Sequence, residues 1–250
     1  IINIYLIQID FFEDNLQLYI NTIATLLASN EYPNDMKYYL FENIELFLKS
    51  TKKDNLKNTE LYRPIIESIS TLFTLVESDD DFLLTKSGKF ILYLMSKTFE
   101  SNIFDQNCLE LALSHIGDDN WVNRFSSLSI FDSISILLEE DVLIEKVQFF
   151  VYMISDPSDL CRKTVYKIMK RISISQKDVF VSDLHQLFYT AVLESIPKEE
   201  NPEIFIYGLK CLSKFCENSG SEILNQHCES ILKICSLHLN ESSVELHTFI

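Results

Sequence analysis

Hydrophobic positions recur along most of the chain with the spacing of an α-helix. In the segment 159–173, apolar residues lie at 160, 161, 165, 168, 169 and 172. In the segment 120–138, large apolar residues again follow one another at intervals of three or four: Trp121, Phe125, Leu128, Phe131, Ile134 and Leu138. This spacing places the apolar side chains on one face and predicts amphipathic helices.

Short polar breaks separate these helical segments and divide the chain at regular intervals. They read NEYPND, STKKDNLKN, ESDDD, GDDN, SDPS, PKEENPE and ENSGS, and they carry the Asp, Asn, Ser, Pro and Gly residues at which helices start or stop. The breaks predict about a dozen helices, arranged in pairs whose second members begin near residues 35, 82, 121, 159, 202 and 243. The intervals of roughly 40 residues are typical of HEAT and armadillo repeats.

The expected fold is all-α, a HEAT/armadillo-type α-solenoid in which about six two-helix repeats form one superhelical stack. The approximate repeats are 1–49, 50–98, 99–138, 139–174, 175–217 and 218–250. The low content of turn formers, four glycines and five prolines, agrees with helices rather than sheets. The chain starts without methionine and ends in a helical pattern, so we expect a fragment of a longer protein.

The net charge of the chain limits the kinds of molecule that it is expected to bind. The sequence contains 21 Lys and Arg residues against 37 Asp and Glu residues, a formal net charge of -16. Such a field repels nucleic acid and attracts basic partners. The longest apolar runs are about six residues, far short of the roughly 20 that span a bilayer, so we expect no membrane insertion. The six cysteines include no Cys-x-x-Cys pair and are expected to be buried thiols of a cytosolic or nuclear protein.

No motif in the sequence indicates catalysis. The four glycines are isolated, which excludes the phosphate-binding loop and the dinucleotide fingerprint, and no Gly-x-Ser-x-Gly occurs. His227, Cys228, Cys235 and His238 are close in sequence, but a fourth ligand at the usual short spacing is missing, so a zinc site is disfavoured. We expect neither an enzyme nor a cofactor.

Two of the polar breaks share a pattern that predicts a structural ladder. Both DDNWVNRFSS and DPSDLCRKTV place Asp or Asn before a helix and an arginine in its first turn. We expect the acidic residue to cap exposed N–H groups and the arginine to pair with a carboxylate of the adjacent repeat. The residues assigned to this ladder are Trp121, Arg124, Asp156, Arg162 and Arg171.

Four blocks, in order and at matching intervals, resemble importin-β, the karyopherin receptor of nuclear import. The most specific is MISDPSDLCRKTVYKIMKRIS; DNWVNRFSSLSIFDSI, ESDDDFLLTKSGKFILYLMS and ENPEIFIYGLKCLSKFCE are the others. In the second block, Ser126 and Ser127 stand where the family has alanines. The resemblance covers essentially the whole chain, most clearly residues 75–239.

This resemblance implies a binding protein that takes basic cargo or the importin-α-type adaptor, the Ran GTPase in its GTP form, and the Phe-Gly repeats of nucleoporins. It implies a location in the cytoplasm, the nucleus and the nuclear pore. Asp79, Asp80 and Asp81 are similar to the family's acidic loop and are expected to contact a basic partner, with Phe82 as an anchor. Alternatively, this loop is solvated and Asp81 caps a helix. Glu199, Glu200 and Glu203 form a second candidate acidic loop.

The sequence departs from the family at positions where importin-β has tryptophans that grip the adaptor's basic helix. Here those positions carry Phe82, Lys167 and Lys210. A lysine repels a basic helix that a tryptophan would hold. Either the chain is a divergent importin-β with a relocated grip, or it is another karyopherin. An alternative function is a HEAT-repeat scaffold of the phosphatase-subunit or coat-adaptor type that takes no part in transport.

Overall fold

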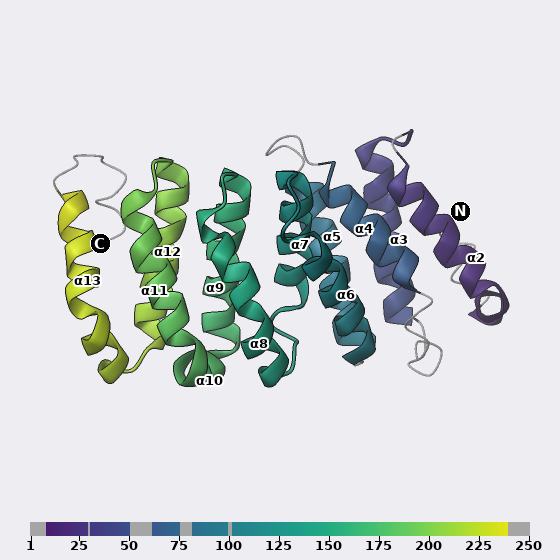
Figure 1. Ribbon diagram of the computed structural model, residues 1–250. Coiled ribbons are helices and arrows are strands. Elements are labelled where there is room, and N and C mark those ends of the chain that lie inside the picture. The colour runs from purple at the N-terminus through teal and green to yellow at the C-terminus, as the bar shows by residue number, and fades with distance from the viewer. Residues whose placement is uncertain (1–8, 30, 51–61, 76–81, 100–101, 240–250) are drawn as a thin grey trace. The chain divides into compact units, whose positions relative to one another are not determined.

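The structure is a computed structural model that describes residues 9–29, 31–50, 62–75, 82–99 and 102–239. Every regular element in these ranges is helical (Figure 1). The prediction of an all-α fold is therefore confirmed for the described residues. None of their helices combines the length and the apolar character that crossing a bilayer requires.

The chain divides into two compact units, residues 1–139 and 140–250, and each is described by itself. The first unit contains α2 (Ile9–Ala28), α3 (Asn34–Ser50), α4 (Arg63–Phe73), α5 (Phe82–Phe99), α6 (Asn102–His115) and α7 (Trp121–Ile134). Helices α2, α4 and α6 pack in one row, and α3, α5 and α7 pack in a second row. Consecutive helices thus form antiparallel pairs that stack in two layers, as in a HEAT array.

The second unit repeats this two-layer arrangement. Its elements are α8 (Glu140–Val151), the 3-10 turn η4 (Tyr152–Ser155), α9 (Asp159–Ser175), α10 (Lys177–Val179), the π-helical turn η5 (Phe180–Leu184), α11 (His185–Ser195), the 3-10 turn η6 (Ile196–Lys198), α12 (Pro202–Asn218) and α13 (Ser221–Leu239). Helix α11 contacts α12, η4, α13 and α8, and α9 and α12 pack closely against each other. The α9–α12 pair forms one layer of this unit.

The second helices of the pairs begin where the polar breaks predict. They start at Asn34, Phe82, Trp121, Asp159 and Pro202, within one residue of the first five predicted positions. The sixth predicted start, near residue 243, lies outside the described residues. The division into six repeats with the bounds given above stays a prediction.

Side-chain capping explains two of these helix starts. The Asn120 side chain accepts a hydrogen bond from the backbone N–H of Val122 at the start of α7. The Asn201 side chain accepts from the N–H groups of Glu203 and Ile204, and Pro202 occupies the first position of α12. Both contacts satisfy donors that have no acceptor within the helix.

Two helix glycines allow neighbouring helices to approach closely. A Cβ atom added at Gly88 on α5 would lie 2.8 Å from the Phe73 ring on α4. One added at Gly208 on α12 would lie 2.8 Å from Cγ1 of Ile196 and 3.2 Å from the Tyr166 ring. Both positions therefore use glycine for its size.

The cysteines differ in exposure more than the sequence suggests. Cys108, Cys161 and Cys211 are buried, and burial raises the pKa of the Cys108 and Cys211 thiols well above the ordinary value. Cys228 and Cys235 are exposed on α13, which corrects the expectation of buried thiols at these two positions. The buried face of α13 is formed instead by Ile223, His227 and Ile234. No group of three His, Cys, Asp or Glu residues in the described part of the chain is arranged to hold a metal ion.

Candidate protein-binding site

The first candidate acidic loop falls where the structure gives no description. Asp79, Asp80 and Asp81 lie outside the described residues. Phe82 is the first residue of α5, but the structure does not describe its side chain. Contact of this loop with a basic partner stays a prediction.

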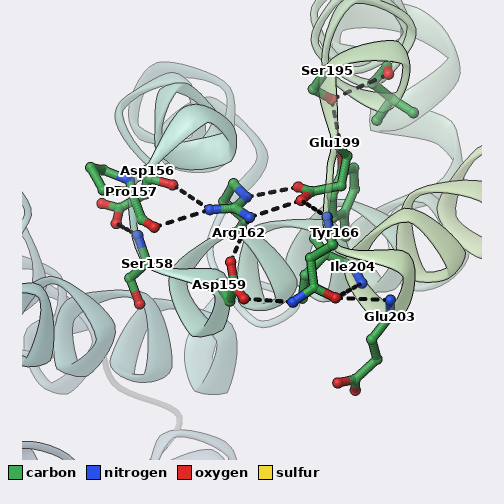
Figure 2. Close-up of polar contacts among 12 residues, drawn as sticks. Asp156, Pro157, Ser158, Asp159, Arg162, Tyr166, Ser195, Glu199, Glu203 and Ile204 are labelled. Atoms are coloured by element: carbon green, nitrogen blue, oxygen red, sulfur yellow. Dashed lines mark hydrogen bonds and ion pairs between the residues drawn. The ribbon is translucent and has the colours of Figure 1, made fainter.

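The second candidate acidic loop, which joins α11 to α12, contains a tightly bound glutamate. The Arg162 side chain on α9 donates two hydrogen bonds to Glu199, from Nε to Oε2 at 2.7 Å and from Nη2 to Oε1 at 2.8 Å (Figure 2). Only 5% of the Glu199 side chain is exposed, against 16% for Arg162. This two-point, charge-assisted contact is among the stronger polar interactions in proteins. It raises the pKa of the Arg162 guanidinium above its ordinary value.

Arg162 also binds the loop that precedes its own helix. Its Nη1 donates to the carbonyl oxygens of Asp156 at 2.8 Å and Pro157 at 3.2 Å, and its Nη2 donates to Asp159 at 2.6 Å (Figure 2). The Asn201 amide closes the network by donating to Asp159 at 2.5 Å. Arg162 therefore holds the α11–α12 connection against the start of α9. Its partner Glu199 belongs to the following helix pair, which is the kind of carboxylate that the ladder hypothesis requires.

The same loop geometry recurs about 40 residues apart. The side chains of Asp118, Asp156 and Glu199 each accept a hydrogen bond from the backbone N–H two residues later, at 2.8, 2.7 and 3.0 Å. Arg124 donates to the carbonyl oxygens of Asp118 and Asp119 at 2.8 and 2.9 Å, as Arg162 does to its own loop. The N–H group of Asn120 holds the pKa of Asp118 below its ordinary value. The acidic residues thus stabilise the turn itself.

The remaining predicted residues have different exposures. Trp121, at the start of α7, and Arg171, on α9, are both partly exposed, whereas Asp156 is buried. Glu200 is exposed beside Glu199. Glu203 is half-exposed and accepts from the Lys163 ammonium on α9 at 2.6 Å. Within the second acidic loop, Glu200 and Glu203 therefore offer more surface to a partner than Glu199 does.

One cluster on the α9–α12 layer was not predicted from the sequence. The ammonium nitrogens of Lys163, Lys167 and Lys210 lie 5.1, 5.2 and 5.7 Å from the ring centroid of Tyr207. Distances of this size place each cation within range of a cation–π interaction. The signal available in the sequence was Tyr207, one helical turn before Lys210. The structure adds that its helix, α12, packs against α9.

A groove in the second unit lies between η4 and α11. Its volume is about 540 Å³, and apolar side chains from the end of α8, from η4 and from α11 contribute to its lining: Val151, Tyr152, Ile154, Leu187 and Ala191. Tyr152 is 71% exposed, and the neighbouring Phe149 on α8 is 47% exposed. The rest of the lining is largely polar and includes the Arg162–Glu199 pair and Glu200. Exposed aromatic side chains beside a groove with an apolar part are typical of a protein-binding surface.

The fold of the chain was compared with known proteins and solved structures. No protein-family model and no curated protein sequence matches the chain. The structure of Kap121p bound to RanGTP matches with a TM-score of 0.85 at 15% identity, over 97% of this chain and 26% of that chain. The karyopherin Kap121p bound to the extreme C-terminus of the protein phosphatase Cdc14p matches with a TM-score of 0.82 at 16% identity, over 94% of this chain and 25% of that one.

The chain has an importin-β-like HEAT fold. A further structure, Kap121p bound to Nup53p, matches with a TM-score of 0.80 at 14% identity over 93% of this chain and 24% of that one. The chain therefore spans about a quarter of the length of this karyopherin. At such identities the likeness is one of fold, and the resemblance inferred from the four sequence blocks is confirmed at that level.

Proposed function

We propose that this chain is part of a nuclear import receptor of the importin-β class. The observation that carries the proposal is the karyopherin fold, matched along nearly the whole chain. Solved structures of Kap121p are bound to RanGTP, to Nup53p, to Pho4p and to Ste12p. By analogy, the chain takes part in binding basic cargo or an adaptor, is regulated by Ran-GTP, and acts in the cytoplasm, the nucleus and the pore without catalysis.

The charge of the chain supports a basic partner. A formal charge of -16 favours encounter with Lys- and Arg-rich segments, and the effect weakens as salt is added. The acidic run Asp79–Asp81 supplies three adjacent charges that such a segment would meet, and Glu200 and Glu203 supply two more on the second unit. Glu199 contributes little because Arg162 binds it and only 5% of its side chain is exposed, and Glu203, which is 56% exposed, contributes less than Glu200 because Lys163 binds it.

The test is equilibrium binding of a labelled Lys- and Arg-rich peptide to the chain. Replacing Asp79, Asp80 and Asp81 by Ser is expected to weaken binding several-fold, because three charges that attract the peptide are removed. The unfolding midpoint is expected to stay unchanged, since Ser and Asp are both common in polar breaks between helices. The matched control replaces three exposed acidic residues elsewhere, Glu31, Asp35 and Glu42, by Ser or Gln. Equal weakening by both triple variants, or no binding by the unaltered chain, would favour a scaffold outside nuclear transport.

The groove between η4 and α11 is the proposed contact for Phe-Gly repeats. A phenylalanine side chain needs an apolar recess and releases water when it enters one. The apolar part of the groove, lined by Val151, Ile154, Leu187 and Ala191, supplies the recess, and Tyr152 offers an aromatic edge for ring packing.

A charge placed in this groove tests the assignment. Ala191→Glu is expected to abolish retention of the chain on immobilised Phe-Gly repeats, because burying the carboxylate costs more than the ring contact gains. Leu232→Glu alters an apolar residue on α13 that is 62% exposed and serves as the control. Retention of the Ala191→Glu variant would remove the groove from the proposal.

A further inference from the structure

The layer formed by α9 and α12 is basic, although the chain as a whole is acidic. Helix α9 contains five basic residues and one acidic residue, and α12 contains two of each. Five of the chain's 21 Lys and Arg residues thus lie in the 17 residues of α9. The two helices pack side by side (Figure 1). Positive charge is therefore concentrated on one layer of the second unit.

Part of this charge belongs to the loop network. Arg162 binds Glu199 and Asp159, and Lys163 binds Glu203 at 2.6 Å. These contacts lie at the ends of α9 and α12 where both helices begin. Lys167 on α9 and Lys210 on α12 lie further along, where basic residues outnumber acidic ones.

Tyr207 gathers the lysines at one point. The ammonium groups of Lys163, Lys167 and Lys210 lie between 5.1 and 5.7 Å from its ring, and they come from both helices. Lys163 is 9% exposed, whereas Tyr207, Lys167 and Lys210 are partly exposed, so the cluster opens to the surface at the latter two lysines. The aromatic ring offsets some of the repulsion among like charges and holds them close together. A carboxylate placed beside Lys167 and Lys210 would relieve that repulsion further.

We propose that the cluster of Lys163, Lys167, Lys210 and Tyr207 is a docking surface for a short acidic peptide segment of a partner protein. This inference goes beyond the proposed function, in which the partner is basic. Lysines at these positions repel a basic segment, and the partly exposed Lys167 and Lys210 present their charge to a carboxylate at the surface. The surface adjoins the second acidic loop at Glu203, which accepts from Lys163, so the second unit presents charge of both signs.

The acidic partner is a peptide rather than a nucleic acid. A nucleic acid carries charge along its whole length and would extend from the cluster onto a chain of net charge -16. Glu203 already stands at the edge of the cluster, 2.6 Å from Lys163, and limits the basic area. A peptide with a few carboxylates matches an area of this size, because the residues on either side of its carboxylates can be uncharged.

The test is a titration of the chain with a fluorescein-labelled glutamate-rich peptide, followed by anisotropy at low salt. The double variant Lys167→Gln/Lys210→Gln is expected to weaken binding about tenfold, since each lost cation removes a few-fold of affinity. The control Lys177→Gln/Lys233→Gln removes the same charge from exposed sites on the same unit and is expected to change binding less than twofold. Tyr207→Leu, which keeps all lysines but removes the ring, is expected to fall between the two.

Parallel titrations separate this inference from the proposed function. A lysine-rich peptide should bind the double variant at least as tightly as the unaltered chain, and a failure of that peptide to bind contradicts the import proposal alone. The docking surface is refuted if the two double variants bind the glutamate-rich peptide equally, or if single-stranded DNA of similar length binds more tightly than the peptide. If the double variant melts at a lower temperature than the unaltered chain, the single variant Lys210→Gln replaces it in the titration with the glutamate-rich peptide, and the same two outcomes apply.

Discussion

At the scale of single residues, Arg162 joins two successive helix pairs of the second unit. Its guanidinium donates to the Glu199 carboxylate, to Asp159 and to two backbone carbonyls. A lysine carries the same charge but cannot donate to all these acceptors from a planar group.

Replacing Arg162 by Lys is therefore expected to lower the free energy of unfolding of the second unit by about 2 kcal/mol, because Glu199 and the carbonyls lose donors in a largely buried place. Urea denaturation followed by circular dichroism measures this change. Arg63→Lys is the control, since Arg63 donates to Glu67 across an exposed helix face and the expected loss is below about 0.5 kcal/mol. A similar loss for both variants would show that the network around Arg162 adds nothing.

Asp105 on α6 makes the first unit sensitive to pH. Burial raises the pKa of its carboxyl group to about 6 from 3.8, and the Ser96 hydroxyl, which donates to the carboxylate, opposes this rise. The folded state thus binds a proton more tightly than the unfolded state does, so stability falls as pH rises from about 4 to about 6 and is then constant with respect to this group.

The variant Asp105→Asn is expected to be more stable than the unaltered chain at pH 7, by roughly 1–2 kcal/mol after allowance for partial exposure, and to show no difference at pH 4. Trp121 is the single tryptophan of the chain and lies on α7, which packs against α6, so its fluorescence reports unfolding of this unit. An advantage of the asparagine variant that persists at pH 4 would contradict the titration of Asp105.

At the scale of helices, the close contact of α12 with its neighbours depends on Gly208. An alanine there would bring Cβ to 2.8 Å from Ile196 and 3.2 Å from Tyr166, both buried. Overpacking of this kind costs about 1–3 kcal/mol, which outweighs the gain of about 1 kcal/mol that alanine brings to a helix.

Gly208→Ala is accordingly expected to destabilise the second unit by about 1 kcal/mol in urea denaturation. Gly220→Ala provides the control, because no atom lies within 4 Å of an added Cβ there, and its effect is expected to stay within about 0.5 kcal/mol. A stabilising Gly208→Ala would mean that the helices move apart at no cost.

Helix positions were largely predictable from the sequence, whereas contacts between helices were not. The starts of α7, α9 and α12 follow directly from Asn120, the Asp156–Ser158 break and the Asn201–Pro202 pair, because caps and breakers act locally. The role of Glu199 was not evident, since an acidic residue in a loop reads as solvated until the partner arginine 37 residues earlier is placed beside it. Tyr207 was missed for the same reason, as its lysines come from two helices.

At the scale of the whole chain, two kinds of charged surface coexist. We propose that the acidic loops bind a basic partner and that the α9–α12 layer binds an acidic one. Lys167 and Lys210, which depart from the importin-β pattern, belong to the second surface. The two lysines that differ from the importin-β pattern thus lie, together with Lys163, around the ring of Tyr207.

The central claim is that this chain belongs to a transport receptor whose hold on a basic partner is controlled by Ran. The most direct measurement follows the anisotropy of a labelled Lys- and Arg-rich peptide bound to the native protein that contains this chain, while Ran is added in its GTP or its GDP form. We expect the GTP form to displace the peptide and the GDP form to leave it bound. A bound peptide that responds to neither form, or to both equally, would contradict the claim.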